Sequence, residues 1–313
     1  MKLKLLASGL MLMMALTAAG EKENLKPSVS NERYTVTLIG ERKAETTPGN
    51  AFLFEILDKR SGKTKLFPLE GVGVRPLKEF IVELKFARGD KLFIIIRWKP
   101  KPVAATIHLV DLEEATLIDK ICGYRPSVSP SGRFCVYDMW YPPHGVRGVS
   151  TVVLVYDTKR RPDENRLGRH SWPAFVGIPI YPERNVREKK YLFWEQQFWS
   201  EEQCYFLSSP FLWSEDERNV VFLCDHGGRT YIVRVDLSEG IEKPRIFERV
   251  IQVREEFVKP EYLGEFRAGL LRNERFARVL HAEGLEWDGP DHVIVKVSGA
   301  LYHLKERIRL QVP

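Results

Sequence analysis

Cysteine is scarce in this chain, and its spacing does not suit a metal site. The four cysteines among 313 residues are Cys122, Cys135, Cys204 and Cys224. Cysteine-based zinc sites use short spacings such as C-x-x-C, and no two cysteines here are that close in sequence. We therefore expect no metal and no cofactor. Four cysteines permit three full disulfide pairings, and the sequence leaves both disulfides and buried free thiols open.

The signatures of several enzyme classes are absent as well. The sequence contains no G-x-x-x-x-G-K-[ST] loop, no G-x-S-x-G elbow, no H-E-x-x-H pair and no G-x-G-x-x-G turn. These motifs serve nucleoside triphosphatases, α/β-hydrolases, zinc proteases and dinucleotide-dependent enzymes, respectively. The sequence therefore gives no support to any of these four activities.

Charge of one sign is not in large excess either. The chain has 48 Lys and Arg against 42 Asp and Glu, a formal net charge of +6. A nucleic-acid-binding domain concentrates its basic residues on one face or stripe. The mild and scattered excess here predicts no nucleic-acid partner.

The chain has one long apolar run, at its N-terminus. Lys2 and Lys4 precede the apolar stretch 5–16, and small residues follow at 17–20. This order is typical of a secretory signal peptide, and the run is shorter than the ~20 residues that a transmembrane helix needs. We expect cleavage near Ala19 or Gly20, which would leave a periplasmic or secreted mature chain, 21–313, with no transmembrane segment.

The rest of the sequence repeats a pattern of short strands. A strand that ends in aspartate recurs at Phe52–Asp58, Ala105–Asp111, Thr151–Asp157 and Thr230–Asp236. Another strand precedes each of these and another follows. Aspartate is favoured in such turns because its side chain can accept a hydrogen bond from the backbone two residues on. A further strand and polar turn open several units, at 83–93, 127–137, 211–222 and 285–295. Four strands in each unit of roughly 40 to 50 residues predict β-propeller blades.

Two units resemble a known family. SVSPSGRFCVYD followed by VVLVYDT, and FLWSEDERNVVFLCD followed by YIVRVDL, are similar to the repeats of TolB-type and WD40-like bacterial β-propellers. The resemblance covers 127–158 and 211–237 well, and 83–112 and 285–305 weakly. It implies an all-β propeller of about five blades, or six, each with four strands. The first unit lacks an evident inner strand, since residues 21–32 are polar and predicted to be a frayed terminus.

Two insertions interrupt the expected single propeller domain, at 159–203 and at 255–283. The first is rich in aromatic residues. The second spaces Leu263, Phe266 and Leu270 as a helix would, which predicts one helical segment over 261–283. Long loops on a rigid scaffold often carry function.

We therefore expect this protein to bind a protein or glycan partner through loops on one rim. Aromatic residues and arginine are over-represented among the residues that dominate binding energy. The stiff loop 141–150, the first insertion and the turn after 225 offer such residues. The candidate binding residues are Tyr141, His144, Arg147, Trp194, Trp199 and His226.

Two other functions are open. A propeller glycoside hydrolase or lactonase would use carboxylates from different blades, and the candidate catalytic residues are Asp138, Asp225 and Glu286. They qualify only if equivalent turns bring them to one pocket. A structural module of an envelope assembly would instead expose an apolar patch.

Replacing both Trp194 and Trp199 by alanine is expected to weaken partner capture without unfolding the domain. The reason is that truncating an aromatic anchor removes interface area while leaving the sheets intact. Pull-down from an envelope extract, with circular dichroism as the folding control, checks this. Unchanged capture would remove these two residues from the interface.

Overall fold

The computed structural model describes most of the chain, and its regular structure is almost entirely β. The described residues form nineteen strands and two short α-helices. Within them, no helix has both the length and the apolar character that a bilayer crossing requires. The described segments are 26–140, 150–167, 176–188, 206–226, 229–251, 255–267, 281–298 and 303–310.

The first eight strands form two antiparallel meanders, in which each strand pairs with the next. The strands of the first sheet are β1 Ser28–Ser30, β2 Tyr34–Lys43, β3 Asn50–Asp58 and β4 Lys63–Gly73. A 3₁₀ turn, Leu77–Glu79, leads into the second group. Its strands are β5 Phe80–Ala87, β6 Lys91–Trp98, β7 Lys101–Asp111 and β8 Thr116–Val128.

The long strand β8 belongs to two groups at once. Up to Tyr124 it pairs with β7, and it pairs with the next strand along the chain at Tyr124 and, after a shift of register, at Ser127 and Val128. Between these stretches Arg125 has a φ of 49°, and a proline follows it. The strand changes direction at this residue. A residue with a side chain adopts this left-handed conformation only where the surrounding structure imposes it. β8 therefore closes the second group and opens the third.

The remaining strands complete three more groups. The third adds β9 Phe134–Trp140, β10 Ser150–Asp157 and β11 Ile178–Tyr181, so that β5 to β11 form one seven-stranded sheet. The fourth contains β12 Phe206–Leu207, β13 Leu212–Trp213, β14 Asn219–His226, β15 Arg229–Asp236 and β16 Arg245–Val250. The fifth contains β17 His281–Trp287, β18 His292–Ser298 and β19 His303–Arg309. The short helices are α2 Glu183–Glu188 and α3 Leu263–Arg267, and further 3₁₀ turns lie at Pro162–Asn165, Glu255–Phe257 and Pro260–Tyr262.

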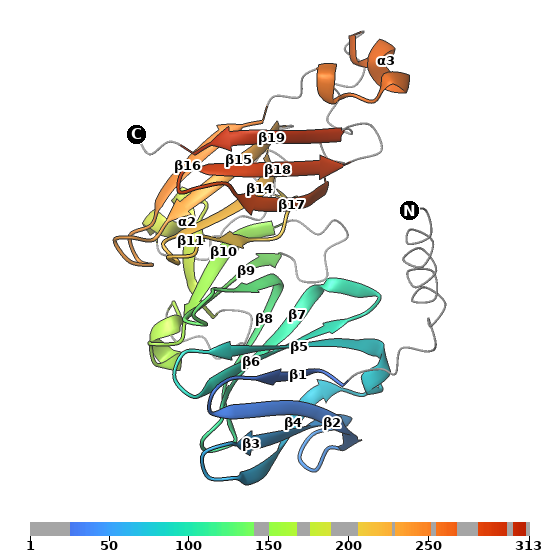
Figure 1. Cartoon of the computed structure of the whole chain (residues 1–313), viewed down its shortest axis with the longest axis vertical. Coiled ribbons are helices and arrows are strands. Elements are labelled where there is room, and N and C mark those ends of the chain that lie inside the picture. Colours follow the sequence, from blue (N-terminus) through green and yellow to red (C-terminus); the bar gives the residue numbers. More distant parts are fainter. Residues whose placement is uncertain are drawn as a thin grey trace, which may run out of the picture.

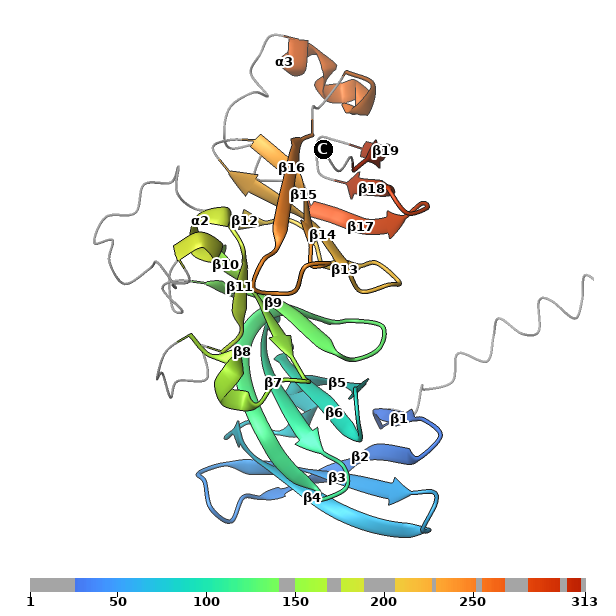
Figure 2. The ribbon, with the colours of Figure 1, turned by 90° about the vertical axis from the view of Figure 1, so that its left-hand side faces the viewer.

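The predicted all-β fold of blade-like antiparallel sheets is confirmed. The groups follow one another along the long axis of the molecule. The first sheet lies at one end and the fifth at the opposite end in both views (Figures 1 and 2). In the described residues, no strand of the first sheet pairs with a strand of the fifth. The described part of the chain is thus an open row of blades.

Apolar side chains on both faces hold the row together. In β6, Leu92, Ile94 and Ile96 face a core shared with the first sheet. The alternate residues Phe93 and Ile95 face a second core, shared with the third group. Side chains alternate between the faces of a strand, so a strand that is apolar throughout is expected to have both faces covered. Two further cores join the third group to the fourth, and the fourth to the fifth.

The structure corrects three sequence-based expectations about strands and helices. The first unit does have an inner strand, β1, which pairs with β2 although it comes from the segment predicted to be frayed. At the end of the last unit, the apolar runs 300–304 and 307–312 predict two strands, whereas the described residues there form a single strand, β19 His303–Arg309. The helix predicted over 261–283 is present only as α3 in the described residues, and 281–283 belong to β17.

The aspartates that mark the repeat act as turn formers. Oδ1 of Asp58, Asp157 and Asp236 accepts a hydrogen bond from the backbone N–H two residues on, at 2.9, 2.9 and 2.8 Å. Asp111 accepts one from the N–H of Glu114, three residues on, at 2.9 Å. The repeated aspartate is therefore explained by local backbone hydrogen bonding.

Three of the four cysteines are free thiols: Cys122, Cys135 and Cys224. Cys204 lies outside the described residues. Burial raises the pKa of Cys135 well above its ordinary value and that of Cys224 to about 12. These two thiols therefore stay protonated and behave as small apolar core residues.

Gly132 provides a test of how the blades are locked together. It has a φ of 72°, and a Cβ at this position would lie 2.2 Å from the carbonyl oxygen of Phe86 on β5. Gly62 has a similar φ of 68° but open space around it. Gly62→Ala should cost about 1 kcal/mol for the left-handed backbone alone. Gly132→Ala should lower the free energy of unfolding by at least about 2 kcal/mol more than Gly62→Ala does, because the backbone at Phe86 must move to make room for the methyl group. Urea unfolding of the two variants measures the difference, and equal costs would contradict this packing.

Candidate functional site

The turn between β13 and β14 is built by its own side chains. The hydroxyl of Ser214 donates to Oδ1 of Asp216 at 2.6 Å and accepts the N–H of Asn219 at 2.9 Å. The N–H of Arg218 also donates to Asp216 Oδ1, at 3.1 Å. Serine and aspartate suit this role because their short side chains can replace backbone partners. The turn is therefore locally fixed, with its carboxylates at the end of the fourth sheet.

The turn between β17 and β18 lies beside it. Trp287, the last residue of β17, donates its indole N–H to the carbonyl oxygen of Trp213 on β13, at 2.9 Å. The N–H of Asp288 donates to the carbonyl of His292 at 2.9 Å, and Gly289 has a φ of 82°. The indole hydrogen bond ties the fifth sheet to the fourth and fixes the plane of the ring.

A cavity of about 450 Å³ lies between these two turns. Its lining residues are Ser214, Glu215, Asp216, Asn219, Trp287, Gly289 and Pro290. The cavity thus combines one large aromatic ring with two carboxylates, an amide and a hydroxyl. Ligand sites commonly have this composition, an apolar wall with a few placed polar groups.

Asn219 is held in one orientation by a buried arginine. Nε of Arg234 donates to Asn219 Oδ1 at 2.8 Å, and Nη1 donates to the carbonyl of Leu310 at 3.0 Å. Arg234 is only 7% exposed. Because the amide oxygen is fixed on the guanidinium, the amide nitrogen of Asn219 is left to donate elsewhere.

The two carboxylates give the cavity an excess of acceptors. Burial raises the pKa of Asp216, but hydrogen bonds from Ser214 and the Arg218 N–H outweigh it and hold the pKa below its ordinary value. Asp216 is therefore ionised at neutral pH. Glu215 is exposed, and among the described residues it makes no hydrogen bond or ion pair. An ionised carboxylate only accepts hydrogen bonds, so the cavity favours a ligand rich in donors.

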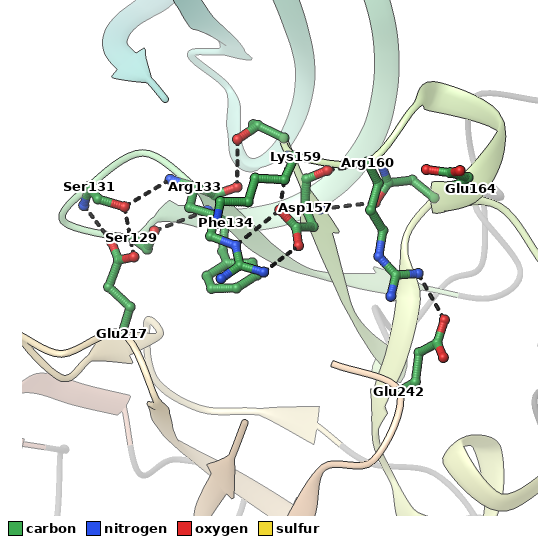
Figure 3. Close-up of polar contacts among 12 residues, drawn as sticks. Ser129, Ser131, Arg133, Phe134, Asp157, Lys159, Arg160, Glu164, Glu217 and Glu242 are labelled. Atoms are coloured by element: carbon green, nitrogen blue, oxygen red, sulfur yellow. Dashed lines mark hydrogen bonds and ion pairs between the residues drawn. The ribbon is translucent and has the colours of Figure 1, made fainter. Parts of the chain in front are cut away.

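Polar contacts hold the third and fourth groups in place next to this site (Figure 3). The hydroxyl of Ser131 donates to Glu217 Oε2 at 2.7 Å, and its N–H donates to the same carboxylate. Arg160 Nη1 lies 2.9 Å from Glu242 Oε1. The β13–β14 turn is thus braced by the third group on one side and the fifth on the other.

Within the third group, Arg133 fixes the end of β10. Its Nε and Nη2 donate to the two oxygens of Asp157, at 3.2 and 2.9 Å. The Arg133 guanidinium also lies over the ring of Phe134, with 4.4 Å from Cζ to the ring centroid. A two-point arginine–carboxylate pair fixes orientation as well as distance, and Figure 3 shows it beside the contacts to the fourth group.

Most of the predicted binding residues lie outside the described part of the chain: Tyr141, His144, Arg147, Trp194 and Trp199. Of the predicted set, His226 is described through its backbone, which ends β14 and pairs with Arg229. The assignment of these six residues to a binding surface remains a prediction.

The three predicted catalytic carboxyls have different partners in different groups. Asp138 on β9 is fully buried, with Oδ2 at 3.3 Å from Arg125 Nη1. Asp225 on β14 is buried, and its Oδ1 accepts from the hydroxyl of Thr230 at 2.5 Å. Glu286 on β17 is exposed, with Oε2 at 3.1 Å from Lys296 Nζ.

The strand order explains why Glu286 and Asp225 are apart. Glu286 adjoins the turn after β17, which lies beside the turn before β14. Asp225 lies six residues along β14 from Asn219, which is about 20 Å in an extended strand. The expectation treated the turn after β17 as equivalent to the turn after β14, at the opposite end of the sheet.

In the described residues, no group of three His, Cys, Asp or Glu could hold a metal ion.

The residues around the cavity could have been found from the same turn pattern. Trp287 and Glu215–Asp216 stand in the two segments that open the fourth and fifth units. Matching each turn to the strand that follows it would have placed the two turns side by side. The buried link from Arg234 to Asn219 has no comparable sequence signal, since it joins residues on neighbouring strands.

Asp225 has a measurable effect on stability as the pH changes. Burial raises its pKa from 3.8 to about 7, more than the Thr230 hydrogen bond lowers it. The folded state therefore holds this proton more tightly than the unfolded state, and stability is lost as pH rises from about 4 to about 7. Asp225→Asn should stabilise the protein by about 2.5 kcal/mol more at pH 8 than at pH 5.

Urea unfolding at the two pH values measures this difference. Asp58→Asn is the control, because hydrogen bonds lower the pKa of Asp58, so this carboxyl is ionised in both the folded and the unfolded state at pH 5 and pH 8 and its effect should not change between them. A gain from Asp225→Asn that does not grow with pH would show that this carboxyl is ionised in the fold.

Comparison with known proteins gives only distant structural likenesses. No family model and no curated protein matches the chain. Oligopeptidase B from Leishmania major is similar at 11% identity and a TM-score of 0.40, over 91% of this chain and 33% of that one. The β-propeller domain of the trilobed protease from Pyrococcus furiosus, described as having an open velcro topology, matches at 10% identity and 0.27, over 92% and 96%.

A third similar structure, the Dos1 propeller, matches at 8% identity and a TM-score of 0.29, over 86% of this chain and 54% of that one. The chain spans 33%, 55% and 40% of the first three structures that it matches. Each of these TM-scores is below 0.5, so the fold of this chain is described from its own strands and not from these likenesses.

Proposed function

We propose that this protein is an exported binding protein that holds a glycan in the cavity between the β13–β14 and β17–β18 turns. The observation that carries the proposal is the fixed ring of Trp287 on a cavity whose other polar groups include two carboxylates. Export rests on the signal-peptide pattern of residues 1–20 and on the resemblance to TolB-type repeats.

The chemistry of the cavity matches that of a sugar. A pyranose presents an apolar C–H face and a rim of hydroxyl groups. The indole of Trp287 offers an apolar surface for that face, and its N–H is already satisfied by Trp213, so the ring needs no polar partner from the ligand. Glu215 and Asp216 accept from hydroxyl groups, and the Asn219 amide nitrogen can donate to them.

The bracing of the turns favours binding without rearrangement. Glu217, next to the cavity, is held by two donors from Ser131, and Trp287 is held by Trp213. A site that is already ordered loses less conformational freedom when its ligand binds.

A structural role in an envelope assembly is the second candidate. It predicts exposed apolar residues, and the described residues include four large ones: Leu66, Val74, Ile81 and Leu117, at 63%, 76%, 42% and 46% exposure. All four belong to the first two groups of strands or the link between them, away from the cavity at β13–β14. Scattered exposed apolar residues are common on ordinary surfaces, so this observation is weaker than the built cavity.

Glu215→Gln should weaken glycan binding at least about tenfold, because a hydrogen bond to a carboxylate contributes more than one to an amide. Its side chain makes no described contact, so the fold should be unaffected. Glu55→Gln is the matched control, an exposed glutamate on β3. Binding of a panel of soluble oligosaccharides, measured by titration calorimetry, gives the affinities.

Two outcomes would contradict the proposal. One is the absence of binding to any oligosaccharide of the panel by the unaltered protein. The other is a sugar affinity that Glu215→Gln and Trp287→Phe leave unchanged.

A further inference from the structure

A second cavity lies at the other end of the molecule, between the first sheet and the β7–β8 turn. Its volume is about 260 Å³, and Arg33, Tyr34, Lys63, Lys65, Asp58 and Glu113 contribute to its lining. The space exceeds several times the ~30 Å³ share of one water molecule. It is large enough for a small charged group with a short tail, and too small for a protein segment.

Two buried hydrogen-bonding groups at this cavity have no partner in the described part of the chain. They are the hydroxyl of Tyr34 and Nε of Arg33. The Tyr34 side chain is 1% exposed. Buried polar groups in folded proteins are almost always paired, so two unpartnered donors on neighbouring residues that both line this cavity are unusual and point to an absent acceptor.

The rest of the Arg33 guanidinium is already engaged. Nη1 pairs with Asp90, and Nη2 lies 3.5 Å from Glu113 Oε1. The guanidinium also lies over the ring of Tyr34, with 4.9 Å from Cζ to the ring centroid. These contacts fix the group, so that its Nε–H is the donor left over beside the tyrosine.

Tyr34 keeps its proton and can also donate. Burial raises the pKa of Tyr34, and the neighbouring carboxylate of Asp90 raises it further. A protonated phenol and a guanidinium N–H are both donors. The ligand that satisfies both is one that offers acceptors.

Charge favours an anion among such ligands. Lys63 makes no ion pair in the described residues, and the ammonium of Lys65 donates to a backbone carbonyl, that of Glu113, which leaves its charge uncompensated. The acidic groups already have partners. Glu113 and Asp90 face Arg33, and Asp58 accepts the N–H of Arg60 at 2.9 Å within its own turn.

We propose that this cavity binds an oxyanion, that is, a carboxylate, phosphate or sulfate group. One oxygen accepts from the Tyr34 hydroxyl and from Arg33 Nε–H, and the ammonium groups of Lys63 and Lys65 balance the charge. This site is separate from the glycan cavity, which is lined by residues of the fourth and fifth groups and rich in acceptors instead of donors.

The purified protein is titrated with inorganic phosphate, sulfate and acetate at constant ionic strength, and binding is followed by NMR shifts of backbone amides. At least one anion is expected to saturate, with shifts at 33–34 and 63–65. Tyr34→Phe should lower the affinity at least tenfold and leave the fold intact, because its hydroxyl has no described partner to lose. Lys63→Gln should lower affinity about threefold or more by removing one charge.

Lys99→Gln is the matched control, an exposed lysine whose side chain makes no described contact. Its affinity should equal that of the unaltered protein. A parallel titration with glucose 6-phosphate separates the two sources of the anion. Saturation by inorganic phosphate alone indicates a free anion, and tighter saturation by the sugar ester indicates an organic ligand; both support the site.

Two results would overturn the proposal. The first is the absence of saturable binding by every anion tested, including the sugar ester. The second is binding that Tyr34→Phe and Lys63→Gln change no more than Lys99→Gln does, which would place the anion elsewhere on the protein. A thermal unfolding curve of Tyr34→Phe that matches the unaltered protein confirms that lost binding is not lost folding.

Discussion

The central sheets of this protein are apolar on both faces. This constraint sets the architecture. β6 directs Leu92 and Ile94 toward the first sheet and Phe93 toward the third group, so neither face can be left to solvent. Burial of apolar area supplies about 25 cal/mol per Å², and a row of sheets maximises it without long connections. The shared strand β8, bent at Arg125, then joins two groups covalently and by hydrogen bonds.

Stacking the sheets brings their turns together, and this is how sites arise. The β13–β14 and β17–β18 turns are not close in sequence, yet Trp287 donates to the backbone of Trp213. The outward face of the fifth sheet carries ion pairs, among them Lys296 with Glu286 at 3.1 Å and Arg309 with Asp291 at 3.1 Å. Charged pairs on that face are readily solvated, which suits a sheet that ends the described row.

The sequence predicts the strands well because strand formation is locally encoded. A run such as KLFIIIRW predicts a strand, and Asp157 predicts a turn, from only a few neighbouring residues. The short strand β1 was missed because Ser28–Ser30 is polar, and its pairing partner on β2 supplies the reason for its structure. The hydrolase alternative required Asp225 and Glu286 to converge, and whether two turns meet depends on which strand each turn follows, which the sequence does not show. The orphan hydroxyl of Tyr34 was invisible, since it depends on side chains from two sheets.

The two cavities have opposite chemistry and can be treated as independent. The site at Glu215 is rich in acceptors, while that at Tyr34 is rich in donors. They lie in groups at opposite ends of the row (Figure 1), separated by the third group. Substitutions that share no partners and lie more than about 10 Å apart have additive energetic effects. Loss of binding at one cavity should therefore leave binding at the other unchanged. Energetic coupling between the two cavities would require the central sheets to move. Because β6 has a packed core on each face, such a movement would have to repack both cores.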